Sequence, residues 1–285
     1  MTPRSGSVRY TLAGAFHSMA YVEWGDPAAP PVICLHGLTR NGRDFDMLAE
    51  GLADRFRVIC PDLPGRGASD WLPDAALYQA PSYVSPLTHL VAAIGQEVMW
   101  VGTSLGGIVG MIIASMPGQP ITRLVLNDVG PFIPKAAIAR IRDYLSVTAS
   151  GVLAEFADVA ALERHLRLVH EPFGPLTDAQ WAHLARYSAQ TLPDGRVAMH
   201  YDPKFTVPFC EAEPADVDLW ALWPATSRLP VLAIRGASSD VLSAEVLARM
   251  QETGAQAFVV PEAGHAPALM DPAQIAAVRR FLEGG

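Results

Sequence analysis

Short apolar runs rich in β-branched residues recur along the chain and are typical of buried parallel strands. They occupy residues 31–35, 56–60, 97–101, 123–126, 231–234 and 257–260. An alternating segment at 20–24 predicts an antiparallel strand at the edge of the sheet. Helical spacing occurs between these runs, at residues 45–53, 108–116, 243–251 and 272–282. Because strands alternate with helices, the pattern predicts an α/β fold with a mostly parallel central sheet and helices on both faces.

The alternation is interrupted between residues 131 and 226. Amphipathic helical patterns occupy residues 138–145, 153–170 and 178–188, and a connection rich in proline and tryptophan follows them. An insertion of this size between two core strands is typical of a cap over the strand ends. We therefore predict a core formed by residues 1–130 and 227–285 and a helical cap, or lid, formed by residues 131–226.

Composition and charge exclude several classes of protein. Half of the 285 residues are apolar, which is enough for one large α/β domain with an insertion. The net charge of −8, without any cluster of Lys and Arg, argues against binding to nucleic acid. Residues 98–116 are long enough to cross a bilayer, but their glycines and the absence of flanking basic residues favour a buried strand and helix. We expect no membrane insertion.

The three cysteines are spaced neither for a disulfide framework nor for a zinc site. No apolar signal segment occurs near the first residue. Both observations favour a reducing compartment, and we expect a cytoplasmic protein. The sequence leaves open whether the chain forms a homo-oligomer.

A motif typical of a nucleophilic serine follows the apolar run at 97–101. Residues 102–106 read Gly-Thr-Ser-Leu-Gly, which matches G-x-S-x-G between a predicted strand and a predicted helix. A sharp turn at this point strains the serine backbone and leaves no room for side chains at Gly102 and Gly106. The helix N-terminus also favours developing negative charge. We predict that Ser104 is a nucleophile.

Two further residues complete a predicted catalytic triad. His265 follows the last predicted strand, and Asp240 follows the strand before it, from which a carboxylate can hold the imidazole tautomer. The order Ser104, Asp240, His265 is the Ser–acid–His order that accompanies the G-x-S-x-G turn. We predict that His265 is the general base and that Asp240 orients it. Asp128 is the alternative acid, although a role at the start of the cap is favoured for it.

The loop after the first parallel strand contains His36, Gly37 and Leu38. It lies at the same sheet edge as Ser104, because the carboxyl ends of parallel strands meet there. The backbone N–H groups of Leu38 and Leu105 are therefore predicted to form an oxyanion hole. His36 is interpreted as a structural residue that braces this loop.

No residue cluster has the spacing of a metal or cofactor site. His165 and His170 are five residues apart on a predicted helix, and the acidic residues of 211–218 do not match a calcium-binding loop. Neither glycine-rich nucleotide motif is present in its required context. We predict no metal and no cofactor.

The motifs together resemble the α/β-hydrolase superfamily, most closely its branch of bacterial esterases, lactonases and C–C hydrolases. The resemblance is carried by residues 35–38, 61–70, 102–107 and 264–265 and does not extend to the cap. Serine at position 104 departs from the aspartate nucleophile of haloalkane dehalogenases and epoxide hydrolases. Residues 266–268 read Ala-Pro-Ala, where hydrolases of ring-cleavage products often have a tryptophan.

The resemblance implies a serine hydrolase that cleaves an ester or lactone of a small or medium apolar substrate through an acyl-enzyme. A C–C hydrolase or cofactor-free perhydrolase with the same triad, and a ligand-binding protein without catalysis, are the alternatives. A small-molecule substrate is the expected partner. The candidate pocket residues are aromatic side chains of the cap, for which a place in the cap's own core is the alternative: Trp181, Tyr187, Phe205 and Phe209.

Overall fold

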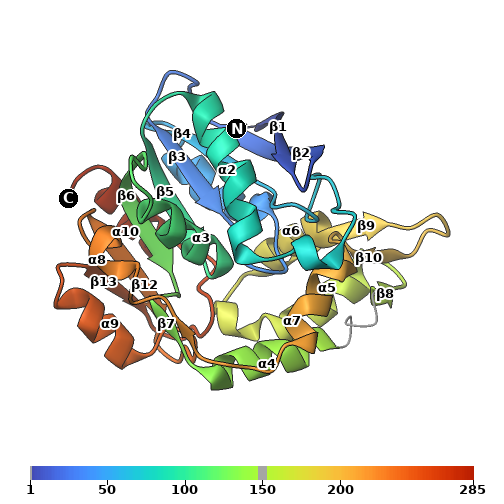
Figure 1. Cartoon of the computed structure of the whole chain (residues 1–285). Helices are drawn as coiled ribbons and strands as arrows, with labels where there is room; N and C mark the ends of the chain where they lie inside the picture. Colours follow the sequence, from blue (N-terminus) through green and yellow to red (C-terminus); the bar gives the residue numbers. More distant parts are fainter. Residues whose placement is uncertain (1, 147–152) are drawn as a thin grey trace.

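The computed structural model describes residues 2–146 and 153–285, and its core is an eight-stranded sheet (Figure 1). Along the sheet the strands lie in the order β1-β2-β4-β3-β5-β6-β12-β13. They are β1 (Arg4–Leu12), β2 (Ala15–Trp24), β3 (Pro31–Leu35), β4 (Arg57–Pro61), β5 (Val98–Thr103), β6 (Ile121–Asn127), β12 (Val231–Gly236) and β13 (Gln256–Val260). The strands from β4 to β13 are parallel, and β1 and β2 are antiparallel to their neighbours. The predicted α/β fold is confirmed.

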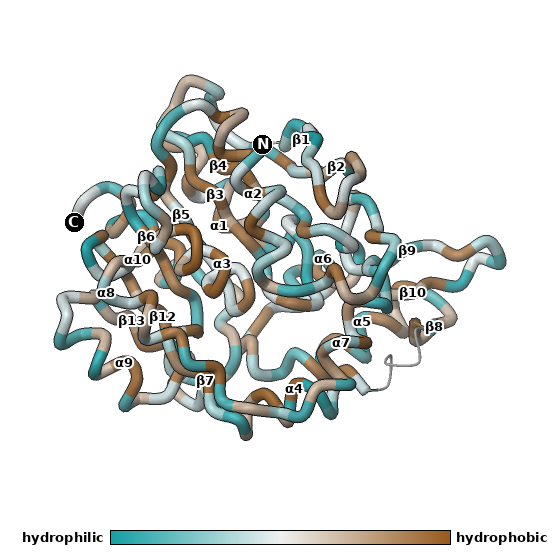
Figure 2. The backbone as a smooth tube through the Cα atoms, viewed as in Figure 1, coloured by the Kyte–Doolittle hydropathy of each residue, from teal (hydrophilic) through white to brown (hydrophobic). Residues whose placement is uncertain are grey.

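The predicted edge strand at residues 20–24 is the end of β2, which lies inside the sheet. The edge position belongs to β1, which pairs with β2 from Arg4 opposite Glu23 to Leu12 opposite Ala15. Tyr10 is the single buried residue of β1. Figure 2, coloured by residue hydropathy, shows that this strand is more hydrophilic than the central strands. A polar strand of this kind is missed when apolar runs are the criterion.

Side chains of the parallel strands alternate between two apolar layers, as the period of two requires. Ile33 and Leu35 of β3 belong to one cluster, which also contains side chains of α2 (Ala80–Ile94) and α3 (Leu105–Ala114). The opposite cluster contains side chains of α1 (Asp46–Leu52) and α10 (Pro272–Leu282). Helices therefore cover both faces. Helix α9 (Ala244–Gln251) lies between β12 and β13 in the chain, and the short helix α8 (Trp223–Thr226) precedes β12.

The insertion between β6 and β12 forms the cap at one side of the sheet (Figure 1). Its helices are α4 (Lys135–Leu145), α5 (Val159–Val169), α6 (Asp178–Ser188) and α7 (Thr206–Glu211). A short pairing of β7 (Phe132–Ile133) with β11 (Val217–Asp218) joins the two ends of the insertion. The cap is thus tied at its base while its helices extend over the strand ends.

The cap also contains a small antiparallel sheet that the sequence did not predict. Its strands are β8 (Glu155–Phe156), β10 (Val197–Met199) and β9 (Ala189–Thr191), in that order. β8 replaces the first part of the helix predicted at 153–170, which begins only at Val159 with Asp158 as its N-cap. Strands of two or three residues carry too little periodicity to be recognised. Among the described residues no helix is both long and apolar enough to cross a bilayer.

Candidate active site

Ser104 occupies a strained turn between β5 and α3. Its φ of 51° and ψ of −114° lie outside the regions that residues with a side chain favour, at a cost of about 1–3 kcal/mol. A Cβ atom at Gly102 would collide with the Gly106 carbonyl, and one at Gly106 would collide with the Leu35 carbonyl of β3. The glycines at these two positions are therefore required by the close approach of α3 to the sheet, which is the physical reason anticipated from the motif.

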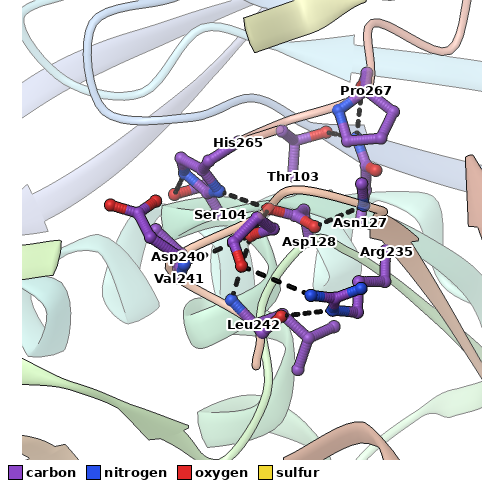
Figure 3. Close-up of polar contacts among 12 residues, drawn as sticks. Thr103, Ser104, Asn127, Asp128, Arg235, Asp240, Val241, Leu242, His265 and Pro267 are labelled. Atoms are coloured by element: carbon purple, nitrogen blue, oxygen red, sulfur yellow. Dashed lines mark hydrogen bonds and ion pairs between the residues drawn. The ribbon is translucent and has the colours of Figure 1, made fainter. Parts of the chain in front are cut away.

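Ser104 and His265 are in hydrogen-bond contact, and a buried carboxylate lies behind the histidine (Figure 3). The Nε2 atom of His265 is 2.9 Å from Ser104 Oγ, and its Nδ1 atom is 2.8 Å from Oδ2 of Asp128. The Asp128 side chain is fully buried at the end of β6. A carboxylate accepts the proton of Nδ1, which leaves Nε2 with the lone pair that can accept the Ser104 proton.

Asp240 does not occupy the position predicted for it, so the predicted triad is wrong in its acid. The Asp240 carboxylate instead accepts hydrogen bonds from Nε and Nη2 of Arg140 at 2.5 and 2.8 Å, and its side chain is 44% exposed. Partial burial raises the pKa of Asp240, but the ion pair with Arg140 outweighs this effect and holds the pKa below its usual value.

The loop after β12 supports Asp128 through hydrogen bonds. The acid itself directly follows β6. Ser239 Oγ donates to Asp128 Oδ2 at 2.5 Å, and the Gly236 N–H donates to Oδ1 at 2.8 Å. In this turn Ser239 faces the centre of the site, and its neighbour Asp240 faces the cap. Asp128, kept as the alternative acid in the sequence analysis, is the residue that the structure places against His265.

Asn127 is a supporting residue that the sequence analysis did not assign. Its Nδ2 donates to Thr103 Oγ1 at 3.0 Å and to the Pro267 carbonyl at 2.8 Å. The bonds connect the ends of β5 and β6 to the loop that carries His265. Its position beside Asp128 at a strand end was the available signal for this role.

The loop that contains the predicted oxyanion donor Leu38 passes directly beside Ser104. A Cβ atom at Gly37 would lie 3.7 Å from Ser104 Cβ. His36 Nδ1 donates to the Gly37 carbonyl at 2.7 Å, and His36 Nε2 accepts from the Leu63 N–H at 2.9 Å. Burial lowers the pKa of His36 to about 3, so the ring is neutral and this tautomer is fixed.

The anchored carbonyl belongs to the same peptide group as the Leu38 N–H, and the planar peptide fixes the direction of both. Across residues 2–146 and 153–285, neither the Leu38 nor the Leu105 N–H donates to a protein acceptor. Leu105 is the first residue of α3, where backbone N–H groups lack partners within the helix. Both amides are therefore available to a ligand beside Ser104.

A cavity of about 310 Å³ adjoins Ser104 and His265. Its apolar wall combines Leu38 of the core with Ile141, Leu145, Val169 and Phe173 of the cap. Its polar lining includes the following side chains: Thr39, Arg40, Arg140, Tyr144 and His170. Because the cap supplies about half of the lining residues, the cap and the core together determine the shape of the space around Ser104.

The four aromatic residues predicted for this pocket, Trp181, Tyr187, Phe205 and Phe209, do not line it. Trp181 and Phe205 are buried, and Phe205 packs against the guanidinium of Arg66 at 4.0 Å from the ring centre. Tyr187 packs against the Arg43 guanidinium in the same way, at 3.7 Å. Trp181 and Phe205 are thus internal residues, whereas Tyr187 and Phe209 are partly buried outside this cavity. The aromatic residues at the cavity are Tyr144 and Phe173.

A strained serine, a histidine in contact with it and a buried carboxylate, all at the carboxyl edge of a parallel sheet, define a serine hydrolase of the α/β class. The chain belongs to the Alpha/beta hydrolase family, whose sequence model matches residues 32–278. It is a hydrolase.

Individual relatives extend over the whole chain. The 3-hydroxybutyrate-oligomer hydrolase of Cupriavidus necator is 42% identical, with 99% of each chain covered. The crystal structure of an alpha/beta hydrolase from Novosphingobium aromaticivorans superposes with a TM-score of 0.87 at 36% identity, covering 99% of each chain. The structure of E-2-(acetamidomethylene)succinate hydrolase superposes with a TM-score of 0.81 at 25% identity, covering 99% of this chain and 100% of that one.

Proposed function

We propose that this protein hydrolyses carboxylic esters through an acyl-enzyme on Ser104, with His265 as base and Asp128 as the acid that orients it. The observation that carries the proposal is the continuous hydrogen-bonded chain from Ser104 Oγ through His265 to Asp128. This arrangement converts a weakly acidic hydroxyl into a nucleophile, because the imidazole accepts its proton and the carboxylate stabilises the resulting imidazolium.

The reaction proceeds in two steps. Ser104 Oγ attacks the ester carbonyl carbon while its proton passes to His265 Nε2, and the N–H groups of Leu38 and Leu105 stabilise the oxyanion. The carbon–oxygen bond to the leaving group breaks as His265 returns the proton to that oxygen, which releases the alcohol. A water molecule, deprotonated by His265, then attacks the acyl-enzyme and releases the acid and free Ser104.

Short oligomeric esters of hydroxy acids are the substrate class that we propose. The relative from Cupriavidus necator is named for 3-hydroxybutyrate oligomers and matches this chain over its whole length. The cavity of about 310 Å³ suits a small substrate, since ligand pockets span about 300–1,000 Å³. A lactone contains the same ester group in a ring and would be opened by the same steps.

The first test is hydrolysis of the linear 3-hydroxybutyrate dimer and of p-nitrophenyl butyrate by the wild type and by Ser104→Ala. We expect the wild type to cleave both, and the variant to lose at least about a thousandfold in kcat because the nucleophile is absent. A fluorophosphonate probe should label Ser104, as located by peptide mass spectrometry.

Ser115→Ala, at the other end of α3, is the matched control and should keep both activity and labelling. Retained turnover in Ser104→Ala would refute the nucleophile. Labelling of Ser104 without cleavage of any ester would mean that the nucleophile is active but acts on another kind of bond, such as a C–C bond.

A further inference from the structure

The cavity at Ser104 is lined by cations in a chain that is acidic overall. Its described lining contains two arginines, Arg40 and Arg140, and no aspartate or glutamate, whereas the whole chain has a net charge of −8. The carboxylates that pair with these arginines, Asp44 and Asp240, lie outside that lining. A pocket with this lining favours a substrate that carries negative charge.

We propose that Arg140 binds a free carboxylate on the leaving-group side of the scissile ester, so that the enzyme selects esters whose alcohol part is a hydroxy acid. This inference rests on the ester hydrolysis proposed above and assigns its specificity to one residue of the cap.

The location of Arg140 supports this assignment. Arg140 and His265 both line the cavity at Ser104 and a second cavity of about 340 Å³ beside it. The second cavity is also lined by the carboxylates of Glu171, Asp240 and Glu262, and Arg140 is the one arginine among its described lining residues. His265 has to protonate the leaving oxygen, so the alcohol part of the substrate lies on the His265 side of Ser104. Arg140 therefore borders the path of the alcohol part. In a 3-hydroxy acid, only a few atoms separate the ester oxygen from the carboxylate.

Arg140 also has donors to spare. A guanidinium has five N–H groups, and Asp240 engages only the Nε and Nη2 atoms. Within the part of the chain that the structure describes, no residue accepts a hydrogen bond from Arg140 Nη1. The side chain is 49% exposed, so a carboxylate can approach its outer edge and form two parallel hydrogen bonds. Asp240 holds the guanidinium in place for that approach.

Arg40 does not offer the same access. Its side chain is 5% exposed, and Asp44 engages its Nε and Nη2 atoms. Its Nη1 atom faces His170 Nε2 at 3.5 Å. Burial, followed by the nearby charge of Arg40, lowers the pKa of His170 well below its usual value, so this ring is neutral and can accept from the guanidinium. Arg40 is part of the cavity floor, and Arg140 is the accessible cation.

The test compares two forms of one substrate, the linear 3-hydroxybutyrate dimer as its free acid and as its terminal N,N-dimethylamide. Both contain the same single ester, and only the acid carries the charge. Product release is followed by liquid chromatography and mass spectrometry for the wild type and for Arg140→Met, Arg140→Lys and Arg142→Met. Arg142 belongs to the same helix but does not line either cavity, which makes it the matched control.

We expect wild-type kcat/KM to be about tenfold or more higher for the acid than for the amide, as a charge-assisted contact would give. Arg140→Met should remove this preference by raising KM for the acid, with the amide changed less than about twofold. Arg140→Lys should recover part of it, and Arg142→Met should keep it.

Equal loss on both substrates in Arg140→Met, or unchanged selectivity, would overturn the role of Arg140 while ester hydrolysis stands. If the wild type cleaves neither substrate, nor p-nitrophenyl butyrate, the proposed function fails and the inference fails with it.

Discussion

At the scale of single residues, one position in a turn separates two very different roles. Ser239 donates to the buried Asp128, and the next residue, Asp240, forms an exposed ion pair with Arg140. The sequence could predict that Ser104 and His265 meet, because each follows a strand at the same sheet edge. It could not choose the acid, because Asp128 and Asp240 both follow core strands. The choice depends on which side chain of the turn after β12 faces inward. The direction of a side chain in a turn cannot be predicted from the period of the hydrophobic pattern.

Substitution of the two acids distinguishes these roles. Asp128→Asn should lower kcat for p-nitrophenyl butyrate by about a thousandfold or more, because an amide cannot stabilise the imidazolium or hold its tautomer. Asp240→Asn should change kcat for this neutral ester by less than about threefold. Steady-state kinetics on both variants, with circular dichroism to verify folding, checks this prediction. The opposite ranking would restore Asp240 as the acid.

At the scale of elements, the long apolar segments were predictable and the short or polar ones were not. Five of the six parallel strands contain a run that is buried on both faces, as β3 does from Pro31 to Leu35, whereas in the edge strand β13 only Val260 is buried. In β1 the inward positions are Gly6, Val8, Tyr10 and Leu12, so the period of two is present, but the residues between them are polar and exposed. Helix α2 was also missed, and Pro86 lies inside it, where proline argues against a helix.

We predict that the cap elements around the cavity limit the size of the acyl group that fits. Phe173 lines the cavity, whereas Trp181 is buried inside the cap. Phe173→Ala should enlarge the space beside Ser104 and shift the ratio of kcat/KM for p-nitrophenyl octanoate over butyrate upward by about tenfold or more, since a single methylene in an apolar pocket is worth about tenfold or more. Trp181→Phe should leave this ratio unchanged. If this ratio shifts in Trp181→Phe and not in Phe173→Ala, Trp181 and not Phe173 lines the acyl pocket.

At the scale of the whole molecule, buried ionisable groups couple the stability of the fold to pH in opposite directions. Burial lowers the pKa of His36 to about 3, so between that value and the usual 6.5 the unfolded chain binds the extra proton, and stability falls as the pH falls. Burial raises the pKa of Asp62 to about 6, so the folded chain binds the extra proton there and stability falls as the pH rises. The two slopes oppose each other in mildly acidic solution.

Replacement of His36 should reveal its contribution to the pH dependence of the free energy of unfolding. His36→Asn loses the bond to the Gly37 carbonyl and should destabilise the fold at pH 8. The destabilisation should be smaller at pH 5, by up to about 1.4 kcal/mol for each pH unit below the usual histidine value, because only the wild type has to keep a neutral ring there. Urea unfolding of both proteins at the two pH values measures the difference. An equal destabilisation at both would show that His36 does not titrate on unfolding.

The carboxylate that orients His265 directly follows β6, so two separate stretches of the chain contribute to the site. The nucleophile and its supporting acid both come before the cap, while the turn after β12 contributes only hydrogen bonds through Ser239 and Gly236. Asp240 is therefore released from the chemistry and is available to hold Arg140. Mutations at Asp240, Arg140 and the cap can accumulate during divergence, or be introduced by design, and retune which esters are accepted without rebuilding the machinery that cleaves them.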